Sequence, residues 1–200
     1  EFNACRSSLF QTITRQILNG NIVAFKDEEF LIPYEPGEFR KRIIKIDTVE
    51  NSVYDPLGNE STVRIPVYDS TSIYERILKF RLKEDWFFDR QKSSLEVRIV
   101  GIAAFEYNAE RDYFREVYWV YFPSCRPYFA RNDVYNFKND AERRSLDDIF
   151  WKRQFSSLIV KESNVQDRYI DQYQKGIDAL VEADKIKTGI FTSEHDLWNY

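Results

Sequence analysis

The segment KEDWFFD, residues 83–89, places three acidic side chains around a wedge of aromatic residues. These acids are Glu84, Asp85 and Asp89. A pair of carboxylates can hydrolyse a glycosidic bond when one acts as general acid and the other as base or nucleophile. The same composition is typical of a surface turn. The residues alone favour the turn, and a hydrolase of polysaccharide or peptidoglycan stays open as an alternative.

A second group of acids lies in KNDAERRSLDDIFWKRQF, residues 138–155, as Asp147 and Asp148. Ser145 is a natural helix N-cap, and Asp148 follows three residues later, in the position of a capping box. Both aspartates fall in the first turn, where the helix dipole favours negative charge. We therefore predict that these acids start a helix and that they do not catalyse a reaction.

Other reactive side chains are scarce. His195 is the single histidine and lies in SEHDLWNY at the end of the sequence, where Ser193 could cap a further helical turn. We expect His195 to be a surface residue, because a triad or zinc site would have to be built around a terminus. Cys5 and Cys125 fit no metal spacing, and the sequence contains no phosphate-binding glycine motif. We expect no cofactor and no metal.

The composition excludes several classes of protein. The chain has 29 basic and 33 acidic residues, interleaved along the sequence, for a formal charge of −4. A dedicated nucleic-acid binder needs a local basic excess, which is missing here. No apolar run is long enough for a membrane helix. Aromatic residues are abundant, with 16 Phe, 13 Tyr and 4 Trp, and Tyr and Trp are enriched where proteins contact other proteins.

The first third of the chain predicts a helix, a strand and a mixed region. Residues 7–19 carry apolar side chains at helical spacing after serines that can cap, and Gly20 ends the helix. IVAF, residues 22–25, reads as a short strand. Residues 26–70 carry weaker signals. There we expect turn chemistry in LIPYEPGEF (31–39), a strand in RIIKI (42–46) and an exposed loop in YDPLGNEST (54–62).

The centre of the chain is strongly β. ILKFRLK, residues 77–83, alternates apolar and basic residues, which predicts Leu78, Phe80 and Leu82 inward and a basic outer face. In 95–107 the same pattern predicts Leu95, Val97 and Ile99 inward and Glu96 and Arg98 outward. REVYWVYFP (115–123) is apolar on both faces, so we expect a central strand. NAERD (108–112) is a hairpin-length loop.

From residue 145 the period becomes helical, which predicts helices at about 145–161, 165–175 and 176–187. The first carries two apolar stripes, one with Leu146, Ile149, Phe150 and Val160 and one with Trp151, Phe155, Leu158 and Ile159. Its second stripe needs a cover from later helices or from another chain. The whole sequence is thus an α+β fold with an N-terminal helix, an antiparallel sheet and a helical C-terminal cluster. We expect one domain over 1–200, with its β-rich part at about 22–123 and its helical part at about 143–200.

Five strings, in order, resemble the GldN/PorN family of the Bacteroidetes type IX secretion and gliding machinery. They are KEDWFFDRQKSSLEVRIVGIA, YWVYFPSCRP, NDAERRSLDDIFWKRQFSS, VKESNVQDRYI and EHDLWNY. The resemblance runs closely from about residue 73 to the end and more loosely over the first helix and strand. Because the chain begins EFNACRSS without a methionine, we expect it to be a fragment or a processed chain, without the signal peptide and N-terminal segment of the precursor.

The resemblance implies a non-enzymatic assembly role in the periplasm. Proteins of this kind pair with an outer-membrane lipoprotein, GldK/PorK, in a large ring beneath the outer membrane. The ring is thought to contact the periplasmic part of the motor protein GldM/PorM and to couple energy to protein export and adhesin movement. In an oxidising compartment, Cys5 and Cys125 could pair, closing a long loop that stabilises by about 4–5 kcal/mol before strain.

The large apolar residues that could contact partners lie in two of these strings or directly after one of them. The candidates are Trp86, Phe87, Phe88, Trp151, Phe155 and Leu158. A carbohydrate-binding module, which would use Trp86, Trp119, Trp151 and Trp198 as platforms, stays open as a further alternative. A row of exposed tryptophans would favour it.

Overall fold

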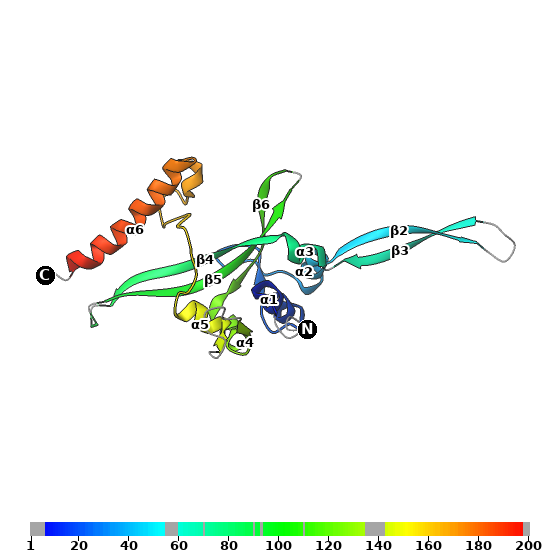
Figure 1. The fold of residues 1–200 in the computed structure, drawn as a ribbon, viewed down its shortest axis with the longest axis horizontal. Helices are drawn as coiled ribbons and strands as arrows, with labels where there is room; N and C mark the ends of the chain where they lie inside the picture. Colours follow the sequence, from blue (N-terminus) through cyan, green and yellow to red (C-terminus); the bar gives the residue numbers. More distant parts are fainter. Residues whose placement is uncertain are drawn as a thin grey trace. The chain divides into compact units, whose positions relative to one another are not determined.

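The computed structural model describes residues 7–54, 60–69, 71–89, 91–92, 94–109, 111–134 and 143–197. Side chains at 45–54, 60–69, 71–72, 194 and 196–197 are outside this description. The chain divides into two compact units, one of Glu1–Glu84 with Ile99–Asp148 and one of Asp85–Arg98 with Ile149–Tyr200. The expectation of a single domain stays a prediction. The α+β class is confirmed, with a helix first, a sheet in the middle and helices at the end (Figure 1).

Helix α1, Leu9–Leu18, begins and ends as its sequence predicts. The Ser8 hydroxyl accepts the Gln11 N–H at 3.2 Å, and the Gln11 side chain accepts the Ser8 N–H at 2.9 Å. This is a complete capping box. Gly20, with φ +75°, takes the left-handed conformation that follows the helix. The buried face contributes Phe10, which stacks on Tyr118 at 5.8 Å between ring centroids.

The main sheet has four strands in the order β1-β6-β5-β4. Their bounds are Ala24–Phe25 for β1, Ile77–Asp89 for β4, Ser94–Asn108 for β5 and Tyr113–Tyr121 for β6. Strand β6 pairs antiparallel with both β1 and β5, and residues 117–120 are all buried. The prediction of a central strand is therefore confirmed over 115–121, whereas Phe122 and Pro123 already belong to the next helix. The predicted hairpin loop 108–112 lies where β5 ends and β6 begins, and its residue 110 lies outside the described chain.

Strand β4 has the opposite polarity to the one its sequence predicts. Leu78 is 61% exposed and Phe80 39%, whereas the cations lie over aromatic rings. The Lys79 Nζ is 3.5 Å from the Phe114 centroid, and the Arg81 guanidinium is 4.4 Å from that of Phe105. Aromatic faces attract cations, so the basic residues take the aromatic side of the sheet and Leu78 and Phe80 point outward. Leu82 is half-buried.

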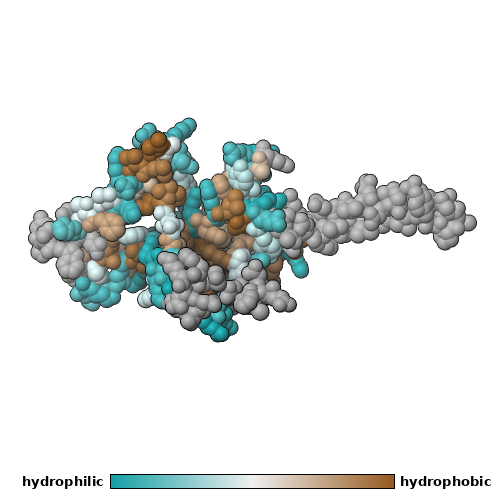
Figure 2. All heavy atoms as spheres, in the orientation of Figure 1, coloured by the Kyte–Doolittle hydropathy of each residue, from teal (hydrophilic) through white to brown (hydrophobic). Residues whose placement is uncertain are grey.

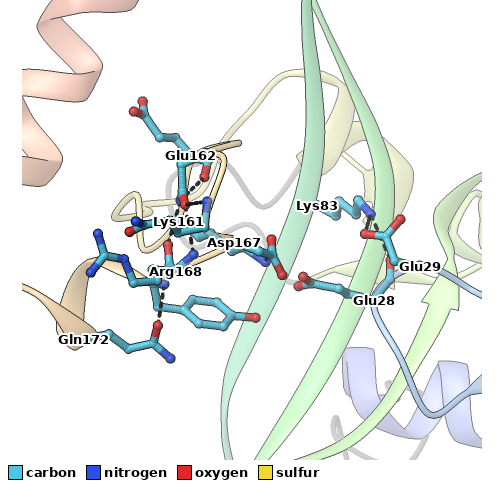
Figure 3. A network of polar contacts seen from close by, with 11 residues as sticks. Glu28, Glu29, Lys83, Lys161, Glu162, Asp167, Arg168 and Gln172 are labelled. Atoms are coloured by element: carbon cyan, nitrogen blue, oxygen red, sulfur yellow. Dashed lines mark hydrogen bonds and ion pairs between the residues drawn. The ribbon is translucent and has the colours of Figure 1, made fainter.

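Lys83 continues this arrangement at the end of the same row. Its Nζ is 5.8 Å from the Phe30 centroid and forms an ion pair with Glu29 at 2.7 Å (Figure 3). It also donates to the Glu28 carbonyl oxygen at 3.1 Å. The expected basic outer face of 77–83 is therefore wrong. In 95–107, Arg98 is exposed as expected, while Leu95, Val97, Ile99 and Glu96 are all half-buried.

An aromatic layer lies on the side of the sheet that these cations cover. Its core is Ala103, Phe105 and Trp119, with Phe25, Phe30 and Phe114 packed against it. Phe30 comes from the segment between β1 and the next helix and has φ +59°, a rare value for a bulky residue. Its ring is edge-on to Phe25, Trp119 and Tyr121. The packing of the ring therefore holds a strained backbone.

Asp27 folds the segment that carries Phe30. Its carboxylate accepts the N–H groups of Leu31 at 2.9 Å and Ile32 at 2.7 Å. The slight burial of this carboxylate opposes ionisation, but backbone N–H donors, first those of Leu31 and Ile32, outweigh it and lower the pKa of Asp27 from its ordinary 3.8. The charged form of Asp27 therefore closes this turn.

The mixed region 26–70 differs most from its sequence-based prediction. Residues predicted as a turn form helix α2, Pro36–Ile43, with proline at its first position. The predicted strand at 42–46 begins only at Lys45, because α2 runs to Ile43. Strands β2, Lys45–Tyr54, and β3, Glu60–Asp69, pair antiparallel and extend into the predicted loop 54–62. Residues 55–59 of that loop lie outside the described chain. Helix α3, Thr71–Arg76, follows.

The helices of the C-terminal part have other bounds than predicted. Helix α4, Phe122–Phe129, and the short strands β7, Asp133–Val134, and β8, Arg144–Ser145, precede α5, Leu146–Trp151. Helix α5 ends ten residues before the predicted boundary of 161. The segment 165–175 contains only the 3₁₀ turn η1, Ile170–Gln172, and α6 runs over Ile177–Leu197. The predicted cap at Ser193 is also wrong, since its hydroxyl donates to the Gly189 carbonyl inside α6.

Gly101 of β5 allows Phe30 to reach the sheet. A Cβ at this position would lie 2.5 Å from Phe30 Cζ. We predict that Gly101→Ala lowers the free energy of unfolding by about 1–3 kcal/mol through overpacking, and by clearly less in a Phe30→Leu background. Denaturant unfolding of the two single variants and the double variant measures this coupling. Gly37→Ala, where a Cβ meets nothing within 4 Å, is the control, and an equal loss there would contradict the contact.

The lowered pKa of Asp27 gives a pH prediction. A carboxylate with a depressed folded-state pKa stabilises above its unfolded value and loses that effect as the pH falls through the folded value. We expect the Asp27 carboxyl to titrate below 3.8 by carbon-detected NMR, and Asp27→Asn to weaken the acid dependence of stability. Titration at or above 3.8 would show that the Leu31 and Ile32 bonds do not hold in solution.

Candidate partner interface

The predicted interface residues all belong to the unit of Asp85–Arg98 and Ile149–Tyr200. Trp151 is 75% exposed, Leu158 56% and Trp86 40%. Phe87, Phe88 and Phe155 are half-buried. Trp151 is thus a large aromatic side chain held mostly in solvent on a short helix. Such a residue is typical of an anchor in a protein contact.

Arg153 joins the two aromatic segments of this surface. Its guanidinium is 5.8 Å from the Trp86 centroid and 5.4 Å from that of Phe155. Phe155 in turn packs on the buried Phe150 at 5.8 Å. Arginine between aromatic rings keeps its charge while covering apolar area. Trp86, Arg153, Phe155, Trp151 and Leu158 are called here the Trp151 surface.

The end of α5 places Arg153. Arg153 has φ +49°, its N–H donates to Phe150 O at 3.2 Å, and the Gln154 N–H donates to Ile149 O at 2.9 Å. These bonds form a Schellman motif with an arginine at the left-handed position where glycine is usual. The helix stops there, so Phe155 and Leu158 do not continue a helical stripe and the two-faced helix expected over 145–161 is wrong. Within α5, Leu146 and Phe150 keep the predicted buried side and Trp151 keeps the exposed side.

The start of α5 follows its sequence. The Ser145 hydroxyl accepts the Asp148 N–H at 3.1 Å, and the Asp148 carboxylate accepts the Ser145 N–H at 3.0 Å. Asp147 accepts two bonds from Arg126 of α4, at 2.9 and 3.0 Å, and this pairing raises the pKa of Arg126. Both aspartates therefore have structural partners at the helix N-terminus.

Of the three acids of KEDWFFD, Asp89 has a structural role in the described chain. Asp89 closes a turn by accepting the Gln91 N–H at 2.8 Å, and this bond, followed by those from Lys92, lowers the pKa of Asp89. A general acid of a glycosidase needs a raised pKa. Asp85 is exposed and Glu84 half-buried. Asp89 is thus suited to a turn rather than to proton donation.

The remaining predicted residues that the structure describes have different surroundings. Trp119 is buried in the sheet, so it cannot share an exposed row with Trp86 and Trp151, and Trp198 lies outside the described residues. Cys125 is buried, its thiol lies 3.6 Å from the Tyr121 carbonyl oxygen, and burial raises its pKa to about 12. Cys5 is outside the described chain, so the Cys5–Cys125 pairing stays a prediction. His195 is exposed in the last turn of α6.

Helix α6 carries a second exposed apolar surface. Ile177 is 78% exposed, Leu180 52% and Val181 48%. Figure 2 shows hydrophobic residues on the surface in the region where α6 begins. The opposite side is anchored, with Ala183 buried. Before α6, Lys161 pairs with Asp167 at 2.6 Å and Asn164 accepts two backbone N–H groups, which order an irregular segment (Figure 3).

A family model described as Gliding motility associated protein GldN matches residues 1–199. The chain belongs to the GldN family. The resemblance seen in the five strings is confirmed, and the match also includes residues 26–70, where the sequence offers no diagnostic string. No curated protein matches the chain. This GldN-family protein is a component of gliding motility and type IX secretion machinery.

Arg153 was not singled out by sequence reasoning. An arginine beside Phe155 is visible in the sequence, but its left-handed conformation and its place over Trp86 depend on where α5 stops. Within the part of the chain that the structure describes, no helix combines the length and apolarity needed to cross a membrane. The same residues contain no cluster of three or more side chains suited to a metal ion.

Phe150 is buried and its neighbour Trp151 is exposed, and this predicts a large loss of stability for truncation of Phe150 and a small one for truncation of Trp151. Phe150→Ala should cost about 3–5 kcal/mol, because Phe150 is 8% exposed and packs on Phe155. Trp151→Ala should change the free energy of unfolding by less than about 0.5 kcal/mol. Chemical denaturation of both variants checks this. A large loss for Trp151→Ala would place its side chain in the protein's own core.

Proposed function

We propose that this GldN-family protein is a non-enzymatic structural subunit of the type IX secretion and gliding apparatus. It lies in the periplasm and forms a ring with an outer-membrane lipoprotein of the GldK/PorK type. The ring contacts the periplasmic part of a motor protein of the GldM/PorM type, and the subunit transmits force from that motor to the export machinery. The exposed Trp151 surface on a member of this family is the observation that carries the proposal.

The chemistry of the Trp151 surface supports a protein partner. Tryptophan and arginine are the residues most enriched in binding hot spots, because they bury large areas at low entropic cost. Arg153 is already held between two rings, so its side chain loses little freedom on binding. The Schellman motif fixes its backbone. The surface is thus preorganised, which reduces the cost of association.

A ring requires two different contact patches on each subunit. The Trp151 surface and the exposed apolar residues of α6, Ile177, Leu180 and Val181, are two such patches. We assign the lipoprotein to the Trp151 surface, because its aromatic and cationic groups suit a stable contact. We assign the motor protein or a ring neighbour to α6, whose aliphatic residues at i, i+3 and i+4 suit a helical partner.

Binding of the neighbouring GldK-type lipoprotein tests the proposal. We expect Trp151→Ala to weaken that binding by at least thirtyfold, as loss of a hot spot of about 2 kcal/mol or more implies. Val165→Ala is the matched control, since Val165 is a fully exposed apolar residue of the same unit outside the Trp151 surface. Interferometry with the soluble part of the lipoprotein measures both. Failure of the unmodified protein to bind the lipoprotein would reject the partner, and equal affinity of Trp151→Ala would reject the surface.

A further inference from the structure

Strand β4 is an edge strand of unusual length and composition. It runs over 13 residues, Ile77–Asp89, and stands last in the strand order. Among the described residues no other strand pairs with its outer edge. Natural edge strands are usually short, charged or interrupted by proline or a bulge, because their free N–H and C=O groups can pair with another chain. β4 contains no proline or glycine.

The charges of β4 are divided along its length. Lys79, Arg81 and Lys83 precede Glu84, and Asp85 and Asp89 follow it. All five lie at odd positions, so they share one face of the strand, since side chains alternate between faces. The even positions carry apolar residues on either side of Glu84, at Leu78, Phe80, Leu82, Trp86 and Phe88. The strand therefore has a basic half and an acidic half on one face and an apolar other face.

Because of this pattern, two copies of β4 are complementary to each other when they run antiparallel. When two copies of β4 run antiparallel with Glu84 opposite Glu84, Lys79 of one copy lies opposite Asp89 of the other and Lys83 lies opposite Asp85. On the other face, Phe80 lies opposite Phe88 and Leu82 opposite Trp86. Directly opposite residues in antiparallel strands contact each other, and opposite charges and aromatic pairs are both stabilising there.

We propose that two copies of this protein associate through antiparallel pairing of their β4 edges, centred on Glu84. The two four-stranded sheets then form one continuous sheet across a two-fold axis. The exposures agree with this occupant, because Phe80 and Trp86, which lie in the paired segment, are 39% and 40% exposed in the single chain. Pairing covers apolar area that the inverted polarity of β4 leaves in solvent.

Other registers are less complementary. Moving the centre to Leu82 places Arg81 opposite Lys83 twice, and like charges directly opposite destabilise a sheet. Moving it to Trp86 shortens the overlap to the segment from Lys83 to Asp89 and removes Phe80 from the contact. The proposed register has one unfavourable pair, Glu84 with its own copy. That pair identifies the register, because in a two-fold strand pair only the residue on the axis lies opposite its own copy.

This contact concerns the self-association of the protein alone. A two-fold contact closes on itself and gives pairs, so it supplies dimeric building blocks and leaves ring closure to other surfaces. The strand pair would form even if the proposed GldK-type partner were wrong. Of the Trp151 surface, it includes Trp86, which belongs to β4, and it does not include Trp151 or Leu158. Its test therefore uses only this protein and does not depend on the lipoprotein.

Cysteine crosslinking in a Cys5→Ser background tests both the contact and its register. Glu84→Cys places the thiols of two copies opposite each other, at a Cβ separation within reach of a disulfide after small adjustment. Leu78→Cys is the control, because its two copies would be about 40 Å apart along the paired strands. Cys125 is buried and does not compete. We expect a covalent dimer for Glu84→Cys under mild oxidation and a monomer for Leu78→Cys on non-reducing gels.

The affinity of the pair supplies a second readout for folded protein. Glu84→Gln removes the like-charge pair on the axis, so its dimer dissociation constant, by analytical ultracentrifugation, should fall several-fold relative to the unmodified protein. A protein that stays monomeric at high concentration would overturn the proposal. A dimer in which Leu78→Cys crosslinks as well as Glu84→Cys, or in which Glu84→Gln has no effect, would overturn it equally.

Discussion

The attraction between the cations of β4 and the aromatic layer of the sheet determines which side chains of β4 face the solvent. Lys79 and Arg81 lie over Phe114 and Phe105, and Lys83 lies near Phe30 while pairing with Glu29. Each contact keeps a charge partly solvated while the alkyl stem covers a ring. Because side chains alternate, the same choice turns Leu78 and Phe80 toward solvent. The strand is thus internally satisfied on its charged face and incomplete on its apolar face.

The aromatic layer itself depends on local constraints. Phe30 reaches the sheet because Asp27 closes a turn with two backbone N–H groups and because Gly101 has no side chain. The bulge between Ala104 and Phe105 changes the register of β5 against β6. The conformational cost of the left-handed backbone at Phe30 is therefore offset by the contacts of its ring with Phe25, Trp119 and Tyr121. These contacts bring together segments far apart in the sequence.

Local signals predicted the elements that they control. The capping boxes of Ser8 and Ser145 and the left-handed Gly20 depend on neighbours in sequence. The apolar segment 117–120 of β6 depends on burial of both faces. The polarity of β4 could not be read from its alternation, because alternation shows that two faces differ and does not show which one meets rings from other segments. The end of α5 was also hidden, since Arg153 takes a conformation that usually marks glycine.

The predicted partner interface stays a prediction, and the structure adds only the surroundings of its residues. The sequence identified Trp86, Trp151 and Leu158 as exposed apolar residues, but their connection through Arg153 required the end of the helix. Exposed apolar residues of this kind are typical of a component of a larger machinery, which is what the family of this chain implies. The acids that first indicated catalysis, by contrast, serve the turn at Asp89 and the start of α5.

The inverted polarity of β4 is the central claim, and the side-chain NMR shifts of Lys79 test it most directly. Its Nζ lies 3.5 Å from the centre of the Phe114 ring, so the ring current should move the Lys79 ε-methylene protons clearly upfield of the other lysines. That shift should disappear in Phe114→Leu. Lys79 ε-methylene protons at the ordinary position of exposed lysines, unaffected by Phe114→Leu, would contradict the account.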